Sequence, residues 1–135
     1  MGSWGTALYS DDLASDLRGD FRDLIGEGLA AEAALDRLMQ EYAASFADAD
    51  EAPVCWLAIA ETAWKLGRPI ARATDGALRV IESGADLLRW SDPRDRRKRA
   101  AVLEEVAETL RSSAPPPKRV PRRFRANNPW VSVAI

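Results

Sequence analysis

Apolar residues recur every three or four positions along most of the chain, and this spacing constrains the fold more than any other sequence feature. The first clear run contains Leu13, Leu17, Phe21 and Leu24, which would share one face of a helix. Similar runs follow, and glycine and proline residues that interrupt helices separate them. We therefore predict an all-α fold, a compact bundle of four to six short helices.

Residues that start and stop helices place the expected boundaries. Ser10 is the expected N-cap of the first helix, and the pair Asp92-Pro93 suits the start of the last one. The expected segments are 11–25, 30–47, a helix from 53 that stops at Gly67, 70–81, a short turn over 85–90, and 92–112. Residues 1–113 would form this helical domain.

The chemistry of the chain changes after residue 113. Three consecutive prolines, Pro115, Pro116 and Pro117, cannot continue a helix and favour an extended backbone. Residues 114–135 have a net charge of +5, whereas residues 8–51 have −9 and residues 52–113 have +2. We predict an extended basic tail over 114–135, either flexible, docked on a partner, or docked on the acidic part of the protein itself.

The first predicted helix carries an acidic face. Asp12, Asp16 and Asp20 follow one another at intervals of four residues, and Asp23 lies nearby. A solvated face is the simpler interpretation, and the functional alternative is a surface that binds a basic protein. Trp4 is a candidate aromatic anchor for such a partner, because binding hot spots are rich in tryptophan.

The chain contains no histidine. This absence excludes the usual general base near neutral pH, catalytic triads that need imidazole, and zinc or di-iron sites with histidine ligands. We expect no catalytic residues, no metal and no cofactor. The single cysteine, Cys55, lies in an apolar run and should be buried and inert. Without a signal peptide or a membrane span in the sequence, we expect a cytoplasmic protein with no membrane partner.

The basic residues of the tail form a second candidate binding site. Positive charges beside an aromatic ring suit phosphate contacts with base stacking, and they also suit an acidic protein surface. The candidate residues are Lys118, Arg119, Arg122, Arg123, Phe124 and Arg125. Arg96, Arg97 and Arg99, near the start of the last predicted helix, would add to a nucleic-acid site.

Two tryptophans, Trp56 and Trp64, are eight residues apart on one predicted helix. Their position suits packing in the core, and the alternative is an aromatic-lined binding groove. We favour core packing for both residues.

The opening Met1-Gly2-Ser3-Trp4-Gly5, followed by Asp11-Asp12, resembles an uncharacterised bacterial family whose members begin M-G-x-W-G and have D-D at this distance. The resemblance continues through 54–60, 64–68 and 84–90, so it covers most of the helical body. Because the function of that family is unknown, the resemblance implies no activity. It implies that longer relatives carry a β-rich extension beyond the basic segment.

These observations favour a non-enzymatic cytoplasmic interaction module that binds a protein partner, with an immunity-protein or antitoxin-like role as one specific form. Small acidic proteins associate rapidly with basic partners through charge complementarity. The first alternative is a nucleic-acid-associated protein that acts through the basic tail. The second alternative is a histidine-free enzyme that uses carboxylates, although no catalytic arrangement of residues stands out.

Overall fold

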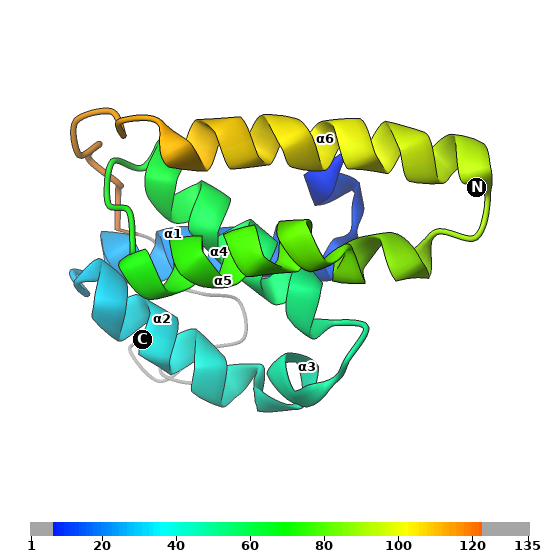
Figure 1. Cartoon of the computed structure of the whole chain (residues 1–135). Helices are drawn as coiled ribbons and strands as arrows, with labels where there is room; N and C mark the ends of the chain where they lie inside the picture. The colour runs from blue at the N-terminus through cyan, green and yellow to red at the C-terminus, as the bar shows by residue number, and fades with distance from the viewer. Residues whose placement is uncertain (1–6, 123–135) are drawn as a thin grey trace.

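The computed structural model describes residues 7–122, which form a bundle of helices without a strand (Figure 1). In chain order the elements are η2 (Leu8–Ser10), α1 (Asp12–Gly26), α2 (Ala31–Glu41), α3 (Ala43–Ala47), α4 (Ala52–Lys65), α5 (Ala71–Ser83), η3 (Ala85–Arg89) and α6 (Pro93–Arg111), where η marks a 3-10 helix. The predicted all-α fold is therefore confirmed for this part of the chain.

Helix α4 forms the centre of the bundle. Most of its residues are buried, among them Leu57 and Ile59, and alanines such as Ala60 and Ala63 let neighbouring helices approach closely. Helices α1 and α5 make the most extensive contacts with α4, and α6 packs on both α5 and α4. In Figure 1, α6 runs along the upper edge, and α2 and α3 lie at the lower edge.

Side-chain caps fix the beginnings of α1 and α6. The Oδ1 atom of Asp11 accepts hydrogen bonds from the backbone N–H groups of Leu13, at 2.9 Å, and Ala14, at 3.3 Å. Asp11 is thus the cap of α1, and the prediction of Ser10 as the cap is wrong by one residue. At α6 the prediction is confirmed, since Asp92 caps the helix and proline occupies its first position.

The prediction of one helix over 30–47 is wrong, because the chain turns at Tyr42 and divides this segment into α2 and α3. Tyr42 has φ −109° and ψ 30°, outside the helical range, and its hydroxyl donates to Asp20 of α1 at 2.6 Å. The turn allows Phe46 of α3 to pack edge-on against Trp56 of α4, with ring centroids 5.3 Å apart. Tertiary contacts therefore interrupt a segment that has helical spacing throughout.

The described part of the tail, residues 114–122, is extended and lies against the bundle. The backbone N–H of Lys118 donates to the carbonyl of Leu66 at 3.0 Å. Gly67 has φ +74°, and a methyl group there would collide with the carbonyl of Pro116. The segment thus crosses the turn between α4 and α5 at a position where only glycine leaves enough space.

Candidate functional site

The acidic face of α1 contains two exposed carboxylates one helical turn apart, those of Asp12 and Asp16. Neither side chain forms an ion pair with another residue in 7–122. Asp20, the third member of the predicted face, is half-buried and accepts the hydrogen bond of the Tyr42 hydroxyl, and Asp23 is also half-buried. The predicted anchor Trp4 lies outside the described residues.

A second pair of acidic residues, on α2, shares one internal counter-ion. Glu32 and Asp36 both accept hydrogen bonds from Nη2 of Arg72 on α5, each at 2.8 Å. The hydrogen bonds that Arg72 donates to Asp36 and Glu32 raise the pKa of its guanidinium group. The carboxylates of Glu32 and Asp36 are thus paired within the protein, whereas those of Asp12 and Asp16 have no ion-pair partner in 7–122.

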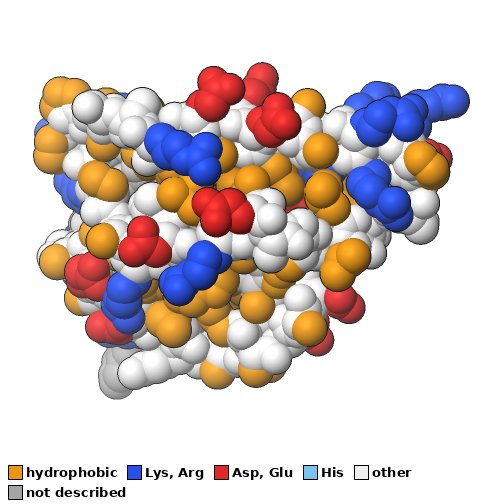
Figure 2. Space-filling view, viewed as in Figure 1, with side chains coloured by type: hydrophobic (Ala, Val, Ile, Leu, Met, Phe, Trp, Pro, Cys, Tyr) orange, Lys and Arg blue, Asp and Glu red, His pale blue; other side chains and the backbone are white. Residues whose placement is uncertain are grey.

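Basic residues gather at the start of α6, which is the right-hand end of the molecule in Figure 2. Arg94, Arg96, Arg97 and Lys98 are all exposed there. Arg99 is different, because its side chain is fully buried. Its predicted contribution to a nucleic-acid site is therefore wrong, since a guanidinium that is enclosed by protein cannot contact a phosphate.

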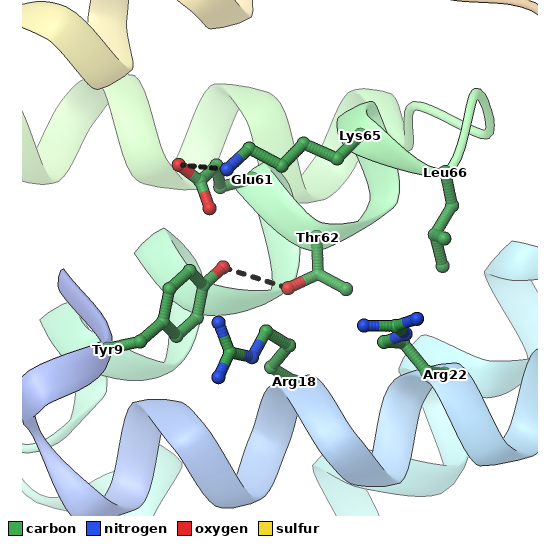
Figure 3. A pocket seen from close by; sticks show the side chains of 7 residues that line it. All are labelled: Tyr9, Arg18, Arg22, Glu61, Thr62, Lys65 and Leu66. Carbon is green, nitrogen blue, oxygen red and sulfur yellow. Dashed lines mark hydrogen bonds and ion pairs between the residues drawn. The ribbon is translucent and has the colours of Figure 1, made fainter.

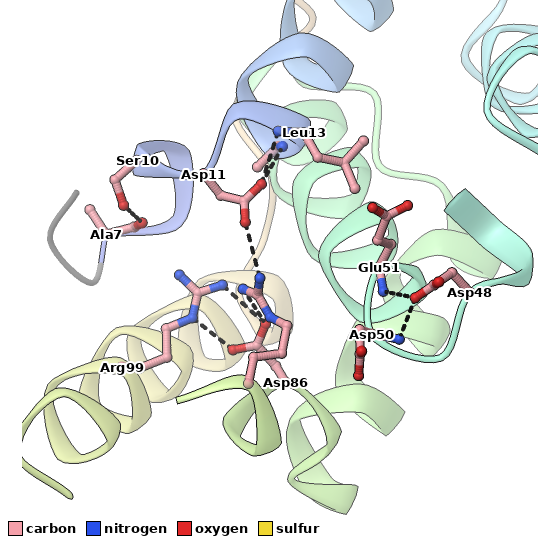
Figure 4. Close-up of polar contacts among 11 residues, drawn as sticks. Ala7, Ser10, Asp11, Leu13, Asp48, Asp50, Glu51, Asp86 and Arg99 are labelled. Carbon is pink, nitrogen blue, oxygen red and sulfur yellow. Dashed lines mark hydrogen bonds and ion pairs between the residues drawn. The ribbon is translucent and has the colours of Figure 1, made fainter. Parts of the chain in front are cut away.

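Arg99 belongs to a buried charge network, shown in Figure 4. Its Nε donates to Oδ2 of Asp86 at 2.7 Å, and its Nη2 donates to Oδ1 of the same carboxylate at 3.2 Å. Arg89 donates to Asp86 at 3.2 Å and to the cap residue Asp11 at 3.1 Å. The network therefore connects α6, η3 and the beginning of α1, and both charged groups of its Asp86–Arg99 pair are excluded from solvent.

The basic side chains of the tail and those of α6 lie at opposite ends of the bundle. Lys118 and Arg119 are exposed, and the Lys118 carbonyl is held by Nη1 of Arg68 at 2.7 Å. Helix α6 has 19 residues, so roughly 28 Å separates its beginning from the residues that lead into the tail. The two basic groups therefore do not form one continuous patch. Arg122 is exposed as well, and Arg123, Phe124 and Arg125 lie outside the described residues.

A cavity of about 200 Å³ lies between η2, α1 and α4 (Figure 3). Its wall combines three cationic side chains with one carboxylate and three uncharged side chains. The lining residues are Tyr9, Arg18, Arg22, Glu61, Thr62, Lys65 and Leu66. This cavity was not predicted from the sequence, although the pairs Arg18–Arg22 and Glu61–Lys65 each have the four-residue spacing that places two side chains on one helix face.

Tyr9 is held firmly at one side of this cavity. Its hydroxyl lies 2.9 Å from Oγ1 of Thr62 and donates to the carbonyl of Ala58 at 3.2 Å. Burial, followed by the nearby Glu61 carboxylate, raises the pKa of Tyr9 above its ordinary value, so the phenol stays neutral. The guanidinium carbon of Arg18 lies 4.1 Å from the centre of the Tyr9 ring, as expected for a cation–π contact.

The cysteine and two of the tryptophans have structural roles, because all three side chains belong to the core or pack against it. Cys55 is fully buried, and burial raises the pKa of its thiol to about 12. Trp56 and Trp64 pack against the core as predicted, and the indole N–H of Trp64 donates to the Ser112 carbonyl at 3.2 Å. Among residues 7–122, no group of three His, Cys, Asp or Glu side chains is arranged to hold a metal ion, and none of the helices there is long and apolar enough to cross a membrane.

Comparisons with protein-family models, with curated proteins and with solved structures found no match. The resemblance to an uncharacterised bacterial family therefore stays a prediction.

Proposed function

We propose that the protein is a non-enzymatic interaction module of the cytoplasm that binds a basic protein partner through the acidic face of α1. The observation that supports this proposal is the contrast between two helices. Glu32 and Asp36 on α2 have Arg72 as an internal counter-ion, whereas Asp12 and Asp16 on α1 are exposed without an ion-pair partner in 7–122. Unpaired charges of one sign attract an oppositely charged partner and speed its association.

An immunity-protein or antitoxin-like role is one form of this function, since basic toxins are suitable partners for an acidic surface. In this proposal Trp4 serves as an aromatic anchor for the partner, because tryptophan is common in binding hot spots. Asp20 and Asp23 lie at the edge of the contact, as both are half-buried.

The test is a pull-down from the native host at low and high salt, with matched charge variants. Asp12→Asn/Asp16→Asn removes the exposed pair on α1, and Glu104→Gln/Glu108→Gln removes an exposed pair with the same four-residue spacing on α6. We expect the wild type and the α6 variant to recover the same partner at low salt, and the α1 variant to lose it. Equal recovery by both variants, or no partner at all, would contradict the proposal.

A second candidate function is nucleic-acid binding by the tail, and the fixed backbone around Lys118 favours it. Hydrogen bonds to Leu66 and from Arg68 hold this segment on the bundle, while the side chains of Lys118 and Arg119 remain exposed. A backbone that is already ordered loses less entropy when its side chains bind phosphates. Arg122, Arg123, Phe124 and Arg125 would extend the same site.

A mobility-shift titration against salt tests this second function. Each lost phosphate contact reduces the steepness of the plot of log affinity against log salt by about 0.9 for duplex DNA. The variant Lys118→Gln/Arg119→Gln should therefore reduce this steepness by roughly 2. The control is Arg97→Gln/Lys98→Gln, an exposed basic pair at the other end of α6, which should leave the slope unchanged. The same slope for all three proteins would exclude the tail as the binding site.

A further inference from the structure

The cavity between η2, α1 and α4 contains unused hydrogen-bond donors. Arg18 and Arg22 form neither an ion pair nor a hydrogen bond with any residue in 7–122, and each guanidinium carries five N–H donors. The third cation, Lys65, has its Nζ 3.6 Å from Oε2 of Glu61, which is long for a charged hydrogen bond, and its side chain is 60% exposed. Three cations therefore line the cavity, and their nearest carboxylate neutralises at most one of them.

The position of Arg18 is fixed before any ligand arrives. Its guanidinium rests on the ring of Tyr9, and the Tyr9 hydroxyl is in turn held by Thr62 and Ala58 of α4. Arg22 lies one turn further along α1, so the two guanidinium groups follow each other along one wall, as Figure 3 shows. One guanidinium that is held in place, with a second beside it, is well suited to a carboxylate or a phosphate, because the paired N–H groups of arginine match its oxygens.

Glu61, the one carboxylate that lines the cavity, is not fully hydrogen-bonded. The Oε1 atom of Glu61 is buried and has no hydrogen-bond partner, and the whole side chain is only 13% exposed. Oε1 is enclosed by the protein, so the oxygen that a ligand can reach is Oε2, which lies 3.6 Å from Nζ of Lys65 and can accept a further hydrogen bond. A ligand that fits both walls therefore carries an anionic group for the arginines and an N–H donor for Oε2 of Glu61.

The volume sets the size of such a ligand. Pockets for drug-sized molecules occupy about 300–1,000 Å³, and this cavity has about 200 Å³. A molecule with the size of a free amino acid is the suitable class.

We propose that this cavity is a binding site for a small zwitterion, whose carboxylate or phosphate is bound by Arg18 and Arg22 and whose ammonium group donates to Glu61. The site is on the side of α1 that faces α4, and it does not use the exposed pair Asp12 and Asp16. The proposal is thus independent of the protein partner.

The test is a calorimetric or NMR titration of the whole protein with two kinds of probe. The first kind is a zwitterion: glycine, serine and glutamate carry a carboxylate, and phosphoethanolamine carries a phosphate. The second kind is a simple anion, either acetate or inorganic phosphate. We expect at least one zwitterion to bind with a dissociation constant in the millimolar range or lower. The same zwitterion should bind at least about tenfold more tightly than acetate, if it carries a carboxylate, or than inorganic phosphate, if it carries a phosphate. A dissociation constant above about 10 mM for every probe would overturn the proposal.

Two variants separate the two walls of the site. Arg22→Gln changes an exposed residue and should weaken zwitterions and simple anions alike by about tenfold. Glu61→Gln removes the negative charge of the acceptor. It should therefore weaken the binding of zwitterions and strengthen the binding of simple anions. Arg79→Gln is the matched control, since Arg79 is exposed on α5 away from the cavity and its loss changes the net charge equally. Equal effects of Arg22→Gln and Arg79→Gln, or weakening of both probe classes by Glu61→Gln, would refute the assignment.

Discussion

The buried pair Asp86–Arg99 gives the most decisive prediction about stability. Both side chains have an exposed fraction of zero, and two hydrogen bonds of 2.7 Å and 3.2 Å join them. We consider the substitution Asp86→Asn, which keeps the shape of the side chain and removes its charge. Arg99 would then remain in the interior as an uncompensated cation, and Arg89 would lose one of its two carboxylate partners.

Removal of one partner from a buried ion pair costs about 3–5 kcal/mol, because the remaining charge keeps its full desolvation penalty. The free energy of unfolding of a domain is about 5–15 kcal/mol, so Asp86→Asn should remove a large part of it. Arg99→Met should cost less, since Asp86 keeps the hydrogen bond from Arg89 at 3.2 Å. The double variant should cost less than the sum of the single variants, because the two residues contact each other directly.

Urea denaturation followed by tryptophan fluorescence measures these differences, and Trp90 is a suitable reporter because the Arg99 guanidinium lies 5.4 Å from its ring. The control is Arg72→Gln, which breaks two exposed ion pairs and should have a much smaller effect that salt diminishes further. A loss below about 1 kcal/mol for Asp86→Asn, at an unchanged denaturant slope, would refute the reasoning.

Three further predictions test other parts of the structure. Gly67→Ala should lower the melting temperature and speed tryptic cleavage of the basic segment, because an alanine is strained at φ +74° and displaces Pro116. Burial raises the pKa of Cys55 from 9.0 to about 12, so the folded protein should resist a thiol reagent at pH 8 that labels the urea-unfolded chain. Trp56→Ala should lower the free energy of unfolding by about 3 kcal/mol in chemical denaturation, because it leaves a void beside Phe46.

The helices could be predicted wherever the local sequence decides where they begin and end. Asp92 and the proline after it start α6 as expected, and Gly84, in the left-handed conformation at φ +74°, ends α5. The break at Tyr42 could not be predicted in this way. No glycine or proline stands there, and the break depends on contacts with Asp20 and Trp56, which are distant in the sequence.

The burial of Arg99 could have been predicted from helical spacing, although not from charge alone. In the run from Arg94 to Arg99 all the basic residues look alike by composition. Helical spacing separates them, because Arg99 shares a face with Leu103, Val106 and Leu110 of the same helix. A charged residue on an apolar face predicts a buried partner, but the sequence does not show that this partner is Asp86.

On the acidic face of α1, the structure distinguishes aspartates that the sequence alone does not. Four aspartates of α1 were equivalent in the sequence, since charge and spacing were the criteria. In the folded chain, Asp20 is engaged by Tyr42, whereas Asp12 and Asp16 are exposed without an ion-pair partner in 7–122. A half-buried carboxylate that already accepts an internal hydrogen bond has less acceptor capacity left for a partner. The binding energy that depends on charge should therefore come mainly from Asp12 and Asp16, and Asp20→Asn should affect stability more than partner binding.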